Sequence, residues 1–205
     1  MRLSRDRGYR RGIQTKLSLA SGLLVLISLA SFGFFSYFVT RRTLDNQMGE
    51  RLVSHAEVAA ATLTPMLRYM AEIGLLSGMS ELGEESYSRL QERLAAAKTA
   101  ANLDNVILIG AENKVLADAN GELRVGDEYV ILKADRVELE LVWRGRSEAS
   151  LLYPGKGGRL YKSAYAPVMT EDKEVLAVLR VEASARFLDT IHNLGVILLL
   201  SALII

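Results

Sequence analysis

Cysteine is absent from this chain of 205 residues, and histidine occurs only twice, at His55 and His192. Without cysteine the protein can form no disulfide bond, has no thiol nucleophile and lacks the c-type haem attachment motif. Two histidines so far apart in sequence argue against a histidine-rich metal site. We therefore expect a protein with no metal and no cofactor.

The chain also lacks a strong excess of charge of one sign, because its formal net charge is only +1. This balance hides two regions: residues 1–16 carry six Lys or Arg and one Asp, a charge of +5, whereas residues 41–193 carry 19 Lys or Arg against 23 Asp or Glu, a charge of −4. A short basic tail before an apolar run is typical of membrane topology. It does not make a nucleic-acid surface, so we expect no nucleic-acid partner.

Residues 17–40 form the long apolar run of the chain and contain no ionisable side chain other than Tyr37. As a helix this run would be roughly 36 Å long, enough to cross a hydrocarbon core of about 30 Å. Basic residues tend to stay on the cytoplasmic side and aromatic rings collect at the membrane interface. We therefore predict a transmembrane helix over residues 17–40 with residues 1–16 in the cytoplasm, although Arg41 and Arg42 weaken the charge asymmetry. The aromatic residues at the far end are Phe32, Phe34, Phe35, Tyr37 and Phe38.

A secretory signal peptide is the competing interpretation, because it too begins with a basic segment and an apolar run. The run here exceeds the usual apolar segment of about 7–15 residues, and no cleavage site of small residues follows it. Residues 37–39, Tyr-Phe-Val, are bulky. We interpret the run as an uncleaved anchor.

A second apolar run, residues 194–205, closes the sequence and is too short to span a membrane. It could be a peripheral tail, but it is more simply the truncated start of a second transmembrane helix, over residues 191–205. On this interpretation residues 41–190 form one extracytoplasmic domain of a multi-pass protein in the bacterial inner membrane. A stretch of that length can bury its own core. Any output domain would follow residue 205.

Apolar residues recur every three or four positions over residues 43–73, which predicts a long helix continuous with the first span. Pro65 favours a kink or a fresh start near Thr64. The glycines of residues 74–83 indicate a loop, and a second helix is predicted from Ser86 or Ser88 to Ala101.

The sequence pattern of the second half of the domain predicts strands and turns. Residues 106–109 and 115–117 predict a hairpin, followed by a loop over residues 118–127 and a brief extended segment over 129–132. Residues 137–143 fit either a strand or a helix. Three further strands are predicted over residues 148–153, 159–168 and 174–182. We expect an α+β fold, with a five-stranded antiparallel sheet and the two long helices packed on one face.

The order of these features carries a resemblance. The chain has an Ala-rich Leu-x-Pro-x-Leu helix ending around Pro65, a Val-Ile-Leu-Ile strand, a Val-Leu-Ala-Asp continuation, Tyr-Ala-Pro-Val over residues 165–168, and a last strand that leads into an apolar run. It resembles the single Cache (PDC, PAS-like) extracytoplasmic sensor domains of bacterial histidine kinases, chemoreceptors and diguanylate cyclases. The resemblance covers about residues 43–190.

The resemblance implies a small-molecule site under the loop of residues 118–147, which would roof the free face of the sheet. In relatives that bind carboxylates, the polar side chains two and four residues before the proline at 167 point into the pocket, and these are Tyr165 and Ser163 here. Alternation puts Tyr161 on the same face. Neither Ser163 nor Tyr165 is cationic, so positive charge for an organic acid or amino acid would come from the roof. The candidate ligand-binding residues are Tyr129, Trp143, Arg144, Arg146, Tyr161, Ser163 and Tyr165, with Arg124 as a further roof arginine.

Three other sequence motifs do not indicate a catalytic or phosphate-binding site. His55 lies in a segment that faintly resembles a kinase phosphoacceptor box, but it is predicted to lie outside the membrane, away from ATP, on a helix surface or dimer seam. The glycine-rich turn of residues 155–158 lacks the spacing of a phosphate-binding loop. Glu138, Glu140 and Glu148 have no nucleophile beside them. We find no catalytic motif in this sequence.

We interpret the chain as the sensing and transmembrane signalling input region of a two-component sensor histidine kinase. The alternatives are the sensor region of a methyl-accepting chemoreceptor or of a diguanylate cyclase, or a membrane-anchored domain that only binds a partner protein. Small residues over 56–61 would permit the close approach of two helices, which predicts a parallel homodimer.

The predicted topology can be tested with reporter fusions. Alkaline phosphatase inserted near Gly121 should be active, because the enzyme folds only outside the cytoplasm, and a fluorescent protein fused before residue 1 should fluoresce, because that end is predicted to be cytoplasmic. Enzyme activity and fluorescence in intact cells are the measurements. A cytoplasmic reporter at Gly121 would overturn the topology.

Overall fold

The computed structural model describes residues 5–73, 84–129, 135–186 and 188. The chain divides into two compact units, Met1–Thr43 with Ile191–Ile205, and Leu44–Thr190. The second predicted span therefore lies outside the described residues, as do the loop of residues 74–83 and the segment of residues 130–132. In the first unit, helix α1 (Arg5–Glu72) carries the only stretch of the described chain that is apolar and long enough to cross a membrane, with a mean hydropathy of 2.0 and no buried residue.

Helix α1 continues without interruption past Thr43 and Pro65 to Glu72. The fresh start predicted near Thr64 does not occur. Pro65 removes the donor that would reach the carbonyl of Ala61, but Ala61 is exposed, so water can hydrate that carbonyl. The hydroxyl of Thr64 donates a hydrogen bond to the carbonyl of Ala60, the residue before Ala61, at 2.9 Å.

Helix α2 (Glu84–Ala100) begins two residues before the earliest predicted start. Ser88, the other predicted start, therefore lies inside the helix. Leu90 and Leu94 face the core, with 1% and 0% of their surface exposed. The residues after the helix turn back at once, because the Leu103 N–H donates to the Lys98 carbonyl at 2.9 Å. This turn delivers the chain to the first strand.

Six strands form one antiparallel sheet with the order β2-β1-β6-β5-β3, and β4 also pairs with β5. The predicted strand over residues 148–153 is divided into two short strands. Its middle residue, Ser150, accepts the N–H of Ser163 with its side-chain oxygen at 2.9 Å, which interrupts the regular ladder. The strands are β1 (Asn105–Ile109), β2 (Val115–Asp118), β3 (Glu148–Ala149), β4 (Tyr153–Pro154), β5 (Leu160–Met169) and β6 (Val175–Ser184).

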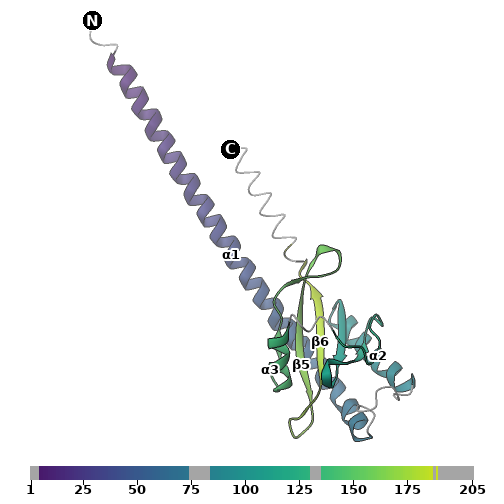
Figure 1. Ribbon diagram of the computed structural model, residues 1–205. Coiled ribbons are helices and arrows are strands. Elements are labelled where there is room, and N and C mark those ends of the chain that lie inside the picture. Colours follow the sequence, from purple (N-terminus) through teal and green to yellow (C-terminus); the bar gives the residue numbers. More distant parts are fainter. Residues whose placement is uncertain (1–4, 74–83, 130–134, 187, 189–205) are drawn as a thin grey trace. The chain divides into compact units, whose positions relative to one another are not determined.

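The α+β fold and the antiparallel sheet are confirmed, and the ambiguous segment of residues 137–143 is helical, as α3 (Arg136–Trp143). Figure 1 shows α2 and α3 on opposite sides of the sheet, and the contacts agree: α2 packs on β1 and β2, whereas α3 packs on β5, β3 and β6. Leu139 and Val142 turn toward the sheet from α3. The segment forms a helix and not a strand because these two residues, three positions apart, fall on one face of a helix and can both pack on the sheet.

Alternation along the strands separates two apolar clusters. The larger one joins α1 and α2 to one face of the sheet, and the smaller one lies under α3 on the other face. Ala56, Ala59 and Ala60, which the sequence suggested as a seam between two copies of the helix, are at most 6% exposed and pack in the larger cluster. These small residues therefore let α1 approach its own sheet. They are not a free face for a second helix.

A buried ion pair ties α1 to β5 on the same face. The ammonium group of Lys162 lies 2.6 Å from Asp45 Oδ1, and the Lys162 side chain is only 7% exposed. Gly49 makes room for this contact, since a Cβ there would lie 3.0 Å from Lys162 Cε. A charge so poorly hydrated needs its partner, so this pair helps to set where α1 crosses the sheet.

The two clusters predict how the domain responds to truncation. Leu94→Ala should lower the free energy of unfolding by about 2–5 kcal/mol, because it leaves a cavity in a fully buried site. Leu151→Ala removes the same atoms from a side chain that is 77% exposed, and should change it by less than about 0.5 kcal/mol. Chemical denaturation followed by circular dichroism checks both values. Equal effects would contradict the packing described here.

Candidate functional site

A row of polar side chains crosses the face of the sheet that α3 covers. Strand register puts Tyr165 of β5 opposite Arg180 of β6, and Ser163 opposite Glu182. All four point to the same face, because each strand contributes residues two positions apart. Three of the four side chains are almost fully buried, so this row lies inside the protein.

Arg180 is the centre of the row and is 1% exposed. Its Nη2 donates to Glu182 Oε2 and to the Tyr153 hydroxyl, both at 2.6 Å. Its guanidinium also lies over the ring of Tyr129, 5.3 Å from the ring centre. A buried cation needs such compensation, because leaving water costs several kcal/mol.

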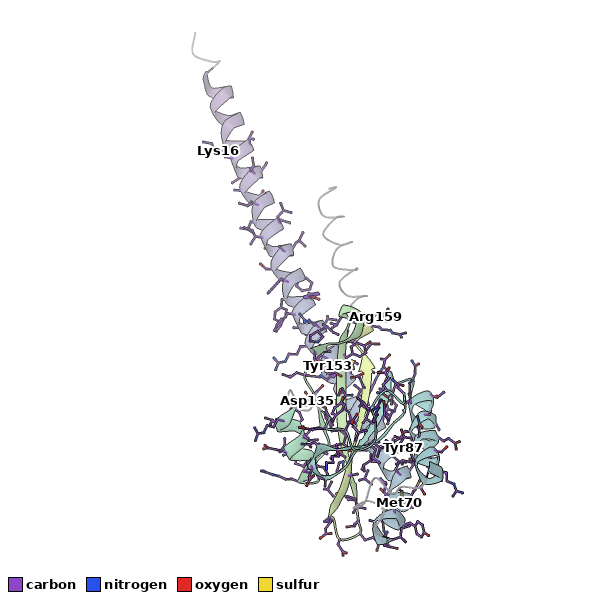
Figure 2. All side chains as sticks on the ribbon, turned by 45° about the vertical axis from the view of Figure 1, so that its right-hand side comes forward. Lys16, Met70, Tyr87, Asp135, Tyr153 and Arg159 are labelled. Atoms are coloured by element: carbon purple, nitrogen blue, oxygen red, sulfur yellow. The ribbon has the colours of Figure 1, made fainter. Side chains whose placement is uncertain are left out.

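The tyrosines extend this network to β4 and α3. The Tyr153 hydroxyl also hydrogen-bonds the Ser163 hydroxyl at 2.8 Å and donates to the Glu182 carboxylate. The Tyr165 hydroxyl donates to Asp135 Oδ2 at 2.5 Å. Asp135 occupies the N-cap position of α3 but makes no capping bond with its side chain. Its carboxylate holds the start of α3 to the sheet instead. Figure 2 labels Asp135 and Tyr153 on this side of the sheet.

One donor of the network has no partner. Arg180 Nε is buried and makes no hydrogen bond to any described residue. A buried N–H without an acceptor costs about 1–3 kcal/mol, and such groups in native proteins call for a water, an ion or a function. The network therefore holds one unused donor beside the aromatic rings.

Burial keeps the three tyrosines of the network neutral. It raises the pKa of Tyr129 to about 12, although Arg180 opposes the shift. Burial also raises the pKa of Tyr153 and of Tyr165 above the ordinary value of 10.0, again against Arg180, and their carboxylate partners add to the effect. The three hydroxyls therefore keep their protons well above neutral pH.

The loop after β2 is held in place by Asp118. This fully buried carboxylate accepts the N–H groups of Asn120, Glu122 and Leu123 at 3.2, 2.8 and 3.0 Å. The chain then returns past β2 to the residues before it, where the Tyr129 N–H donates to the Asn113 carbonyl at 3.0 Å. This pairing sets the Tyr129 ring over Arg180.

A cavity of about 510 Å³ opens between this returning segment and α3. Tyr129 and Leu139, both buried, and Trp143, half-buried, form its apolar walls, while its charged lining residues are exposed. Its volume is in the range of small-molecule sites, about 300–1,000 Å³. The lining residues are Glu112, Asn113, Glu128, Tyr129, Arg136, Leu139, Glu140 and Trp143.

The residues suggested from the sequence fall into four groups. Tyr129 and Trp143 line the cavity, whereas Ser163 and Tyr165 belong to the buried network beneath it. Tyr161 is half-buried and stacks on Tyr153, with ring centres 6.4 Å apart. The roof arginines Arg124, Arg144 and Arg146 are exposed and do not line the cavity, and Arg146 pairs with Glu148 at 3.0 Å.

Sequence reasoning missed Arg180, the cation that the structure puts at the centre. The segment of residues 175–181, Val-Leu-Ala-Val-Leu-Arg-Val, is otherwise wholly apolar, and a single arginine in such a run is the signal that could have found it. Asp135 and Glu182 gave no comparable signal, because acidic residues at the ends of elements are common. Only tertiary contacts distinguish them.

No family model matches this chain, and no curated protein does. Several solved structures match it in fold. The Escherichia coli DcuS sensor domain aligns at 15% identity with a TM-score of 0.49, covering 76% of this chain and 98% of its own. The ligand-binding domain of the Campylobacter jejuni chemoreceptor Tlp3, in complex with L-valine, aligns at 14% identity and a TM-score of 0.41, covering 75% and 66%. The Vibrio cholerae histidine kinase DctB sensor domain aligns at 15% identity and a TM-score of 0.42, covering 70% and 56%.

These neighbours are Cache-type sensor domains. The resemblance seen in the sequence named the same type of domain. At such identities the likeness is one of fold alone, and this chain spans only part of the Tlp3 and DctB domains.

The buried tyrosines predict alkaline sensitivity. Because their folded pKa values exceed the ordinary 10.0, their neutral forms stabilise the fold below that pH, and this stability is lost as the pH rises toward the value of about 12 for Tyr129. Denaturation at a series of pH values should show a constant contribution up to about 10 and a fall above it. Tyrosinate absorbance should rise together with unfolding.

Tyr165→Phe is the matched variant for this prediction. It should be less stable than the wild type at neutral pH, because Asp135 loses its donor, but its stability should fall less steeply above pH 10.0, because one buried ionisable group is gone. An unchanged slope would contradict the assignment.

Proposed function

We propose that residues 44–190 form a small-molecule sensing domain whose ligand occupies the cavity between Tyr129 and α3. One observation carries the proposal: Tyr129 lines the cavity and also lies against Arg180 of β6. A ligand that contacts Tyr129 therefore acts on a side chain that is in direct contact with the last strand. Concave sites with apolar walls and a few polar groups are the usual form of small-molecule sites.

Strand β6 is well placed to carry a displacement. It pairs along its length with β5 and also with β1, and its last residue, Ser184, donates its N–H to the Asp104 carboxylate at 2.5 Å. Beyond β6 the sequence continues to the apolar residues 194–205, which we propose as the start of a second membrane helix. A shift of Tyr129 and Arg180 would thus bias the strand that precedes that helix.

We propose that the chain is anchored in the bacterial inner membrane by residues 17–40 and is multi-pass, with residues 41–190 outside the cytoplasm. The observation behind the first span is the apolar part of α1. The output is proposed to be a histidine kinase, with a chemoreceptor signalling hairpin or a diguanylate cyclase as the alternatives. The coding sequence after residue 205 distinguishes the three, by a histidine box with an ATP-binding domain, a long heptad hairpin or a GG(D/E)EF motif.

A parallel homodimer remains part of the proposal, but on a different surface of α1 from the one first considered. Val58 and Tyr69 of α1, and Ile73 directly after it, are large apolar residues with 64%, 62% and 49% of their surface exposed. Their spacing of eleven and four residues keeps them on one face of the helix. A second copy of α1 would cover this face.

The contrasting function is a domain that only binds a partner protein, and ligand binding separates the two. In a thermal-shift screen of the whole chain in nanodiscs against organic acids, amino acids and amines, a sensor should gain about 2.7 kcal/mol at one hundred times the dissociation constant of its ligand. Tyr129→Ala should weaken that ligand about tenfold or more, because it removes a cavity wall.

Leu151→Ala is the control, since Leu151 is exposed and lines no described cavity. It should leave the affinity unchanged. If no compound stabilises the chain, or if Tyr129→Ala binds the ligand as well as the wild type, this site is not a sensing site.

A further inference from the structure

We infer that the ligand of this cavity is a small organic cation, an amine without a carboxylate of its own. This inference rests on the proposed function and adds the chemical class of the ligand. It differs from the organic acid or amino acid expected from the sequence, and it is argued from the charges and rings that line the cavity.

The charged lining of the cavity is mainly acidic. Glu112, Glu128 and Glu140 stand against a single cation, Arg136, among the described lining residues. Arg136 already has a partner, because its Nε lies 3.4 Å from Glu140 Oε1. An anionic ligand would therefore meet two further carboxylates and no uncommitted cation among these residues.

The carboxylates differ in how far they are neutralised. Glu112 lies 3.2 Å from the ammonium of Lys114, a residue outside the cavity lining. Glu128 makes no ion pair with any residue in the described part of the chain. Glu128 also adjoins Tyr129 in sequence, so its charge and an aromatic wall come from the same segment. This makes Glu128 the principal acceptor for an ammonium group.

The walls suit a cation with an apolar body. The indole of Trp143 is the best aromatic partner for a cation, and such a contact improves binding by about two- to thirtyfold depending on desolvation. Leu139 is buried and offers an apolar surface to a hydrocarbon part. Arg180 does not compete for the carboxylates at the cavity, because its own partner is Glu182, 2.6 Å away.

Amino acids fit less well than simple amines. The ammonium group of a zwitterion would find Glu128, but its carboxylate would need a donor, and Arg136, the one cation among the described lining residues, is held by Glu140. The unpaired Nε of Arg180 is buried beneath Tyr129 and does not line the cavity. The charges of the described lining therefore favour a simple amine over an amino acid.

The test uses probes that match in size and differ in charge. Benzylamine, benzyl alcohol, benzoate and phenylglycine, together with choline and putrescine, are titrated calorimetrically into the whole chain in nanodiscs, with empty nanodiscs correcting for partitioning. The expected result is saturable binding of at least one amine, with the matched neutral and anionic probes weaker by about tenfold or more.

Variants then locate the charge. Glu128→Gln should weaken the amine about three- to tenfold, and Glu128→Lys should abolish amine binding and favour benzoate. Glu92→Gln makes the same charge change on α2, outside the cavity, and should have no effect. Glu112→Gln gives a second test of the lining should the Glu128 variants fail to fold, as judged by circular dichroism.

Each outcome decides something. Binding of an acid or of phenylglycine in preference to the amines, or amine binding that is indifferent to Glu128→Gln and Glu112→Gln, overturns the amine inference but leaves the sensing function intact. Stabilisation by no compound in the wider screen overturns the sensing function itself.

Discussion

The burial of one guanidinium group organises the half of the domain that faces α3. Arg180 is fixed in the middle of a sheet by strand pairing on both sides, so it cannot reach water. A buried charge is tolerated only when counter-charges and hydrogen bonds surround it. These come from β6 itself through Glu182, from β4 through Tyr153 and from the segment after β2 through Tyr129. Arg180 thus links elements that are distant in sequence.

The two faces of the sheet are built on different physical principles. Toward α1 and α2 the strands present aliphatic side chains, and the small residues Ala56, Ala59 and Ala60 let the helix pack closely. Such packing is non-directional and resists change through the cavities that any displacement would open. Toward α3 the strands present a directional network of tyrosines and carboxylates. A network can exchange one set of hydrogen bonds for another, which suits a face that responds to a ligand.

Much of the fold could be read from the chain, because its elements have strong local patterns. The apolar run of residues 106–109, rich in β-branched side chains, and the alternation of residues 159–168 match β1 and β5 closely. The errors arose where a local signal was weaker than its surroundings. Pro65 does not end α1, since the packed residues on either side of it, Leu63 and Leu67, hold the helix in place. The strand predicted over residues 148–153 breaks because of a side-chain contact from Ser150 to the neighbouring strand.

The sequence by itself determined the kinds of elements, the apolar stretch over residues 17–40 and the lack of any cysteine thiol, since these depend on residue type and periodicity alone. It also pointed to Tyr129 and Trp143 as candidate ligand-binding residues. Only the tertiary structure decided where charge lies. Strand register and the returning loop bring a guanidinium, a carboxylate and an aromatic ring together. The pairing of Arg180 with Glu182, or of Tyr165 with Asp135, produces no periodic pattern in the sequence. For the same reason the acidic lining of the cavity, drawn from segments on both sides of Tyr129, could not be foreseen from composition.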